Sequence, residues 1–363
     1  MFSHNGKISA RQVMILLILQ MLNMNMLIMP RIGANYLGRN SYIAPIIAIL
    51  IGLIYLFCVT SLTTKFPKST FVEITKELLP NWISYILIVA FAAKLVISVG
   101  LELRMFGELV NQVMLPRTPI SIIMIVFILS AAYLVKSGIE STGRMSEILI
   151  YFIAVPLIIA LLIMIFKTDY REVLPFFQVD PTDVGIGTVL VSFMFVPLEI
   201  LLMLNGLMKH PNRVRKSGIR AIIVVGVLQA IITLLCITQN GLQETQTQMW
   251  PVIVLMKSLG MNDTIVENQE VLLLIMWVFS IYMYISTSLY IISLIGSRSY
   301  KFKRENVFIL PAVPIILFIA LFPNDLGVVY SYYVRFEYYY GIWFIIPIPL
   351  ILVLIAKMRR GRG

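Results

Sequence analysis

The sequence has little charge and few side chains suited to metal or redox chemistry. Of its 363 residues only 13% are charged, and there are two cysteines and two histidines. Cys58 and Cys236 fall inside apolar runs, so no disulfide framework is indicated. His4 and His210 lie far apart in polar segments, which does not make a metal site. Because no Ser/His/Asp set or phosphate-binding loop occurs either, we expect no catalytic residues, no cofactor and no metal.

Apolar residues dominate instead. They make up 59% of the chain, whereas soluble domains average about 45–50% apolar and about 25% charged residues. This composition excludes a soluble enzyme, a disordered tail and a collagen-like fibre. Many apolar residues lie in runs near the roughly 20 residues that cross about 30 Å of hydrocarbon. The sequence therefore predicts an all-α integral membrane protein that crosses the bilayer many times.

The apolar runs predict ten membrane spans and two short helices outside them. The expected short helices are an amphipathic segment at 68–80 and part of the long loop 242–269, from Trp250 onward. The expected spans lie at about 12–38, 41–64, 83–112, 119–135, 144–166, 184–207, 217–238, 270–297, 306–323 and 340–356.

The net charge of +11 is explained by membrane topology. With the N-terminus in the cytoplasm, and with Arg144 and Arg220 at the span edges counted with the loops, the cytoplasmic segments hold 20 basic residues, the outer loops hold 6, and 3 lie within spans. This bias predicts that both termini are cytoplasmic. The basic loops then face membrane lipids, and no nucleic-acid partner is expected.

Two expected spans contain residues that interrupt a helix. The first carries the segment LNMNMLIMP, from Leu22 to Pro30, and the sixth carries FMFVPLE, from Phe193 to Glu199. Asparagine caps helix starts, and proline removes a backbone donor. Interruptions at matching positions of two halves indicate a 5+5 inverted-repeat transporter fold of the LeuT/APC type, with repeats at about 12–166 and 184–356. The alternative is an ordinary kink in each span.

In that fold the two breaks face each other near the middle of the membrane, where half-helix ends can bind a small molecule. Hydroxyl residues of the eighth span could line the same site, or could simply contribute to helix packing. The predicted ligand-binding residues are Asn23, Met24, Asn25, Met26, Phe193, Phe195, Pro197, Glu199, Ser286 and Thr287.

A second group of polar residues is charged and also lies within spans. Four of them fit within one arc of the third span, so they must face the protein interior or water. We expect them to form a gate or ion pathway, or alternatively a structural ion-pair network near the outer end of that span. The aromatic run from Phe336 is interpreted as an interfacial belt without chemistry. The predicted gating or ion-pair residues are Arg31, Lys94, Glu102, Arg104 and Glu108.

Several motifs in order along the chain resemble the spore germination permease family, the B subunits of nutrient germinant receptors within the amino acid–polyamine–organocation superfamily. They are LNMNMLIMPR, GLELRMFGE from Gly100, FMFVPLE, WPVIVLMKSLGM with VENQEVLLLIMW, and LFPNDLGVVYSYY from Leu321. The chain departs from the family at Asn23, Asn25 and Pro197, which stand where glycine is usual. These replacements narrow the expected cavity and remove one backbone donor.

The resemblance implies a sensor of a small nutrient germinant, such as an amino acid. It would act with a receptor A subunit and a C lipoprotein subunit at the spore inner membrane. An amino acid or organocation permease is the alternative, since it would share the fold and the site. Concentrative uptake by the isolated chain would favour that alternative.

Overall fold

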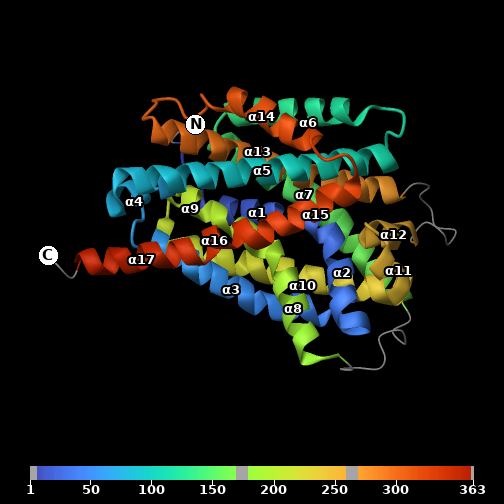
Figure 1. Cartoon of the computed structure of the whole chain (residues 1–363). Helices are drawn as coiled ribbons and strands as arrows, with labels where there is room; N and C mark the ends of the chain where they lie inside the picture. The colour runs from blue at the N-terminus through green and yellow to red at the C-terminus, as the bar shows by residue number, and fades with distance from the viewer. Residues whose placement is uncertain (1–5, 169–178, 259–268, 361–363) are drawn as a thin grey trace.

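A computed structural model describes residues 6–168, 179–258 and 269–360. The described part is helical, apart from one isolated bridge between Ile8 and Met208. Figure 1 shows a bundle in which most helices run along one common direction. The predicted all-α membrane class agrees with this arrangement.

Within the described ranges, seven helices or helical runs are long and apolar enough to cross a membrane. The helix pair α1 (Ala10–Met21) and α2 (Met24–Leu37) adds one more candidate, bent by 53°. The seven are α3 (Ile43–Thr63), α5 (Asn81–Val113), α7 (Ile139–Lys167), the run Pro181–Leu207, the run Pro211–Asn240 that contains α10 (Val214–Asn240), α13 (Gln269–Ser299) and the run Leu326–Arg359.

The remaining apolar helices are shorter. Helices α6 (Ile120–Lys136) and α14 (Ile309–Leu321) occupy the places of the fourth and ninth expected spans. The amphipathic segment forms α4 (Phe71–Leu78), and the long loop contains α11 (Leu242–Thr247) and α12 (Pro251–Ser258). The two short helices expected outside the spans are therefore present, although residues 259–268 of the long loop lie outside the described part.

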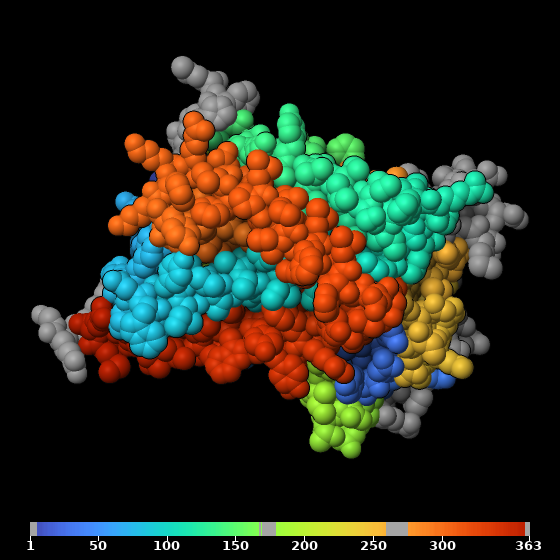
Figure 2. Space-filling model, turned by 45° about the horizontal axis from the view of Figure 1, so that its top comes forward, coloured from blue at the N-terminus to red at the C-terminus, as the bar shows by residue number. Residues whose placement is uncertain are grey.

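Helix α1 lies inside the bundle, where it packs against α7, α10 and α13. Helix α5 runs along most of the length of the molecule, beside α13, α14 and α15 (Leu326–Phe336). In Figure 2 α5 appears as a blue to cyan band between α14 and the red C-terminal helices. A single long helix therefore borders both the interior and the outer surface, and it carries charged residues into the interior.

The prediction for the last span is wrong at its start. It was expected to begin near residue 340, but the helical run begins at Leu326 and continues through a π-helical turn, η7 (Glu337–Gly341), α16 (Ile342–Ile345) and α17 (Pro347–Arg360). Tyrosines and two charged residues lower the apolar content of its first half. They are tolerated in a helix because one face, with Tyr333 and Glu337, is buried in the protein.

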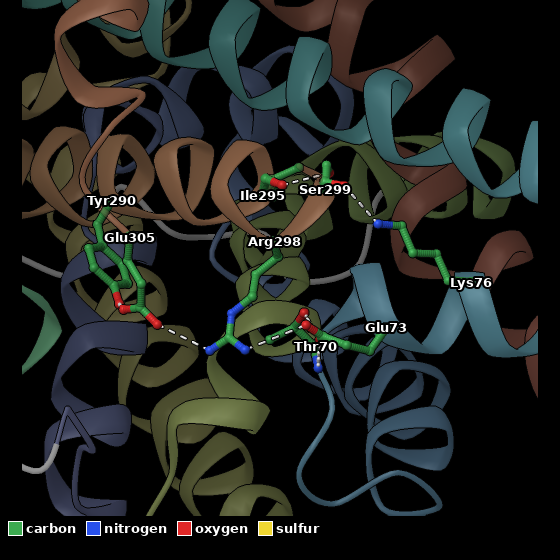
Figure 3. Close-up of polar contacts among 8 residues, drawn as sticks. All are labelled: Thr70, Glu73, Lys76, Tyr290, Ile295, Arg298, Ser299 and Glu305. Atoms are coloured by element: carbon green, nitrogen blue, oxygen red, sulfur yellow. Dashed lines mark hydrogen bonds and ion pairs between the residues drawn. The ribbon is translucent and has the colours of Figure 1, made fainter. Parts of the chain in front are cut away.

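The ends of the chain are attached to the end of the bundle that contains α4. Ile8 pairs through its backbone with Leu207 and Lys209, and the Arg359 side chain donates to the Glu77 carbonyl oxygen. Figure 3 shows a half-exposed network at the same end. There Arg298 of α13 contacts Glu305 at 3.1 Å and Glu73 of α4 at 3.7 Å. Lys76 of α4 donates to the Ser299 carbonyl oxygen at 2.9 Å.

Candidate functional site

The break between α1 and α2 is stabilised by polar side chains. Asn23 caps α2, and its side-chain oxygen accepts from the Asn25 amide at 3.0 Å. The Ser280 hydroxyl of α13 donates to the Leu22 carbonyl oxygen at 2.5 Å and also lies 3.2 Å from that of Leu19. Backbone groups that a helix end leaves unpaired thus gain partners away from water. The capping role expected of asparagine is confirmed for Asn23.

Two further hydrogen bonds connect the break to neighbouring helices. The Gln20 side-chain amide donates to the Tyr284 carbonyl oxygen of α13 at 3.1 Å. The Asn25 side-chain amide donates to the Tyr333 hydroxyl of α15 at 2.8 Å. All four residues are buried. The break is therefore coupled to α13 and to the last helical run, two elements far away in the sequence.

The sixth expected span is not broken as predicted, because Pro197 is accommodated in a continuous helical run that tightens at this point. Helix α8 (Pro181–Ser192) starts at Asp180, whose pKa is lowered because its carboxylate accepts from the hydroxyl and amide of Thr182. It continues directly as a 3₁₀ helix, η3 (Phe193–Ile200), then as α9 (Leu201–Leu204) and η4 (Asn205–Leu207). The 3₁₀ hydrogen-bond pattern often marks strained or functional positions, and here it contains Pro197 and Glu199.

Three charged side chains from different elements meet in the interior. Lys94 of α5 forms an ion pair with Glu199 of η3, and its Nζ also lies 3.3 Å from Oε2 of Glu337 in η7. Ser98 donates to the other oxygen of Glu337 at 2.6 Å. At most 5% of each of the three charged side chains is exposed. We call Lys94, Glu199 and Glu337 the buried ion cluster.

Glu102 adds a fourth buried charge on the same helix. It is fully buried, and within the described ranges neither of its oxygens has a hydrogen-bond partner with normal geometry. It interacts electrostatically with both Glu337 and Lys94. Two carboxyl groups therefore share one lysine ammonium, and a third, that of Glu102, is buried on the same helix. Because buried ions are stable only when paired, this surplus of acidic groups is unusual.

A small closed cavity borders the buried ion cluster. Its volume is about 10 Å³, which is close to the space that one water molecule needs. The site is therefore closed to a molecule as large as an amino acid in this conformation. The cavity is lined by Gln20, Lys94, Leu95, Val196, Pro197, Glu199, Ile200, Tyr284, Ser288, Tyr333 and Glu337.

The other predicted charged residues lie toward the far ends of α2 and α5. Arg104 pairs with Glu108 at 2.9 Å and donates to the Asn324 carbonyl oxygen at 3.3 Å. Arg31 donates to the Gln246 carbonyl oxygen at 3.1 Å and contacts the Met249 sulfur at 2.9 Å. The Arg31 contacts attach α2 to the segment of α11 and α12, and the Arg104 contact attaches α5 to the loop that precedes α15.

The structure divides the five predicted charged residues between two places. Lys94 and Glu102 lie in the interior, whereas the ion pair of Arg104 with Glu108, and the Arg31 contacts, lie toward one end. A single ion-pair network near the outer end of α5 therefore does not describe all of them.

The remaining predicted site residues are buried but do not line the cavity. The cavity is bordered on α13 by Tyr284 and Ser288, one helical turn apart, while the Ser286 and Thr287 hydroxyls lack hydrogen-bond partners within the described part. The residues outside the lining are Asn23, Met24, Asn25, Met26, Phe193, Phe195, Ser286 and Thr287.

The predicted site lacked five polar residues of the cavity: Gln20, Tyr284, Ser288, Tyr333 and Glu337. Glu337 is the most important, because it completes the buried ion cluster. In the sequence, Glu337 stands out as an acidic residue within the aromatic run from Phe336, and that run is interpreted above as an interfacial belt. Gln20 was visible as an isolated amide in an apolar segment.

Comparison with known proteins places the chain in a family. The profile of the family described as "Spore germination protein" matches residues 7–327. The chain is 24% identical to the Bacillus subtilis (strain 168) spore germination protein YndE over 370 residues, covering 99% of both chains. It is 24% identical to spore germination protein A2 of the same strain, covering 86% of both chains. It is also 24% identical to Bacillus cereus spore germination protein GerLB, covering 92% of this chain and 90% of the relative.

The family profile includes α5 and η3 but stops before η7, which supplies Glu337, whereas the alignment with YndE covers 99% of the chain. The family is a non-enzymatic one of receptors and permeases, which confirms the expectation that the chain is not an enzyme. The chain is a multi-pass membrane protein that belongs to the spore germination protein family.

Proposed function

We propose that this protein is the nutrient-sensing subunit of a spore germination receptor and binds a small molecule, such as an amino acid, beside the buried ion cluster. The observation that carries the proposal is the meeting of charged and polar groups at the α1–α2 break. Three elements far apart in the sequence supply the cluster, and Asn25 joins the break to Tyr333. Such a concentration of buried polarity is costly in a membrane protein and typically marks a functional site.

A ten-span inverted repeat is the architecture that we propose for this site. The bent pair α1–α2, the seven long helical runs and the two shorter apolar helices correspond in order to the ten expected spans. The two halves then begin with the bent pair and with the run that contains η3. This pairing supports binding near the middle of the membrane, where half-helix ends meet in transporters of this architecture.

Different parts of the site have different proposed roles. Residues of the first and sixth spans, from Asn23 to Met26 and from Phe193 to Glu199, contact the ligand once the cavity has widened. Ser286 and Thr287 contribute from α13 in that open conformation. Arg31 and the Arg104–Glu108 pair hold the outer gate closed before binding. Binding then shifts the population between closed and open arrangements, which requires that the ligand prefer the open one.

The signal would pass to partner subunits of the receptor. By resemblance, these are an A subunit and a C lipoprotein subunit at the spore inner membrane, with both termini of this chain on the core side. The joint attachment of the chain ends and α4 at one end of the bundle supports a shared face for such contacts.

Germination of complemented spores tests this proposal. A strain that lacks its own receptor B subunit is complemented with this chain and exposed to a panel of amino acids, sugars and nucleosides. We expect germination in response to one chemical class, dependent on the receptor A and C subunits. Uptake into liposomes is measured in parallel with the purified chain. Concentrative uptake without partner subunits would contradict a pure sensor and favour a permease.

A further inference from the structure

Hydrogen-bond acceptors without donors line the closed cavity. Within the described ranges, Oε1 of Gln20 and Oε2 of Glu199 are buried and have no hydrogen-bond partner, and Oε2 of Glu337 has only the ion-pair contact with the Lys94 ammonium at 3.3 Å. All three residues line the cavity. The Gln20 amide nitrogen is already used, since it donates to the Tyr284 carbonyl oxygen. Buried polar atoms are almost always hydrogen-bonded, so this arrangement lacks a donor.

The same region holds more acidic groups than basic ones. Glu199 and Glu337 line the cavity beside one cation, the Lys94 ammonium, and Glu102 is buried on the same helix as Lys94. A water molecule in the cavity would donate hydrogen bonds but would bring no positive charge to acidic groups that outnumber the single lysine. A group that both donates hydrogen bonds and carries a positive charge would satisfy both deficits.

Size and geometry favour an ammonium group over a metal ion. The cavity volume of about 10 Å³ suits a group close to the size of a water molecule. Within the described residues, no cluster of three or more acidic, histidine or cysteine side chains is arranged to hold a metal ion. Lys94 shows that these acidic side chains can bind an ammonium group, because its own ammonium forms ion pairs with both Glu199 and Glu337.

We propose that the cavity bordered by Gln20, Glu199 and Glu337 is a binding subsite for a second ammonium group beside Lys94. The group is either a free ammonium ion or the amine end of the nutrient. Binding of the nutrient's amine end rests on the proposed function, whereas binding of a free ammonium ion does not. In both cases the acidic side chains, and not the helix ends alone, select the ligand.

Thermal unfolding of the purified full-length chain in lipid nanodiscs tests the subsite. Ammonium chloride, methylammonium chloride, sodium chloride and potassium chloride are compared at equal ionic strength. We expect ammonium or methylammonium to raise the unfolding temperature in a saturable way that sodium and potassium do not reproduce. Glu337→Gln should weaken the apparent affinity about 10- to 100-fold, as expected for losing a hydrogen bond to a charged group.

Glu140→Gln is the matched control, because Glu140 lies on α7, where it pairs with Arg144. It should bind ammonium as the wild-type chain does. The wild-type salt comparison remains decisive if Glu337→Gln does not fold. Stabilisation by ammonium alone indicates the free ion, and stronger stabilisation by larger amines indicates the nutrient's amine end. No ammonium-specific stabilisation, or an equal effect of potassium or sodium, would overturn the proposal.

Discussion

At the scale of single residues, the buried ion cluster dominates the energetics of the site. Lys94 lies between Glu199 and Glu337, all three nearly inaccessible to solvent. Removing one partner of a buried pair is costly because it leaves an uncompensated charge. Removing Lys94 should cost more stability than removing either glutamate, because Lys94 pairs with both Glu199 and Glu337.

Replacing this lysine should therefore destabilise the protein strongly. We expect Lys94→Met to lower the free energy of unfolding by about 3–5 kcal/mol. Adding Glu337→Gln should recover part of the loss, because one buried negative charge is removed. Thermal or denaturant unfolding in detergent measures both effects. Arg298→Met is the matched control, since Arg298 is 41% exposed and its partner Glu305 is 37% exposed, and such an exposed pair is worth at most about 1 kcal/mol. Equal losses for the two single variants would contradict this ranking.

At the scale of elements, the α1–α2 break is stabilised by specific hydrogen bonds and is not a local distortion of one helix. Its two helix ends gain partners from Asn23 within the break and from Ser280 on α13. The break and α13 should therefore behave as one unit when either is altered.

Loss of the cap should weaken this unit. We expect Asn23→Ala to lower the free energy of unfolding by about 1 kcal/mol, because the Asn25 amide loses its partner. Asn23→Ser keeps a capping oxygen and should retain most of the stability. Unfolding of both variants in detergent is the measurement. If Ser destabilises as much as Ala, capping is not the role of Asn23.

The positions of the elements could largely be predicted from the sequence, whereas the packing between them could not. The positions of the long helices and the cap at Asn23 could be predicted, because apolar runs and asparagine preferences are local properties. The pairing of Lys94 with Glu199 and Glu337 could not, because it depends on how three distant elements pack. Glu337 was hidden further by its aromatic neighbours, which are also typical of a membrane interface.

At the scale of the whole molecule, the helices connect two opposite ends. Helix α5 spans Asn81 to Val113, about 50 Å at 1.5 Å per residue, and the loops at its two ends belong to different ends of the bundle (Figure 1). The charge bias predicts that the end with α4 and the chain termini faces the cytoplasm.

Cysteine labelling tests this orientation. The native Cys58 and Cys236 are both buried, so they provide a low background. We expect an impermeant thiol reagent applied outside intact vegetative cells to label Arg117→Cys, in the loop after α5. It should label Lys303→Cys, in the loop after α13, only after the membrane is opened. The reverse pattern would contradict the predicted orientation.

The central claim is that the site beside the buried ion cluster senses the nutrient. The most direct test is the germination dose response of spores carrying Asn25→Ala or Glu199→Gln, with receptor abundance measured by immunoblot. Leu50→Ala is the control, because Leu50 is 62% exposed on the outer surface of the bundle. We predict that Asn25→Ala and Glu199→Gln shift the half-maximal nutrient concentration about tenfold or more, as loss of one strong hydrogen bond would, whereas Leu50→Ala does not. Unchanged dose responses at normal receptor abundance for both site variants would contradict the claim.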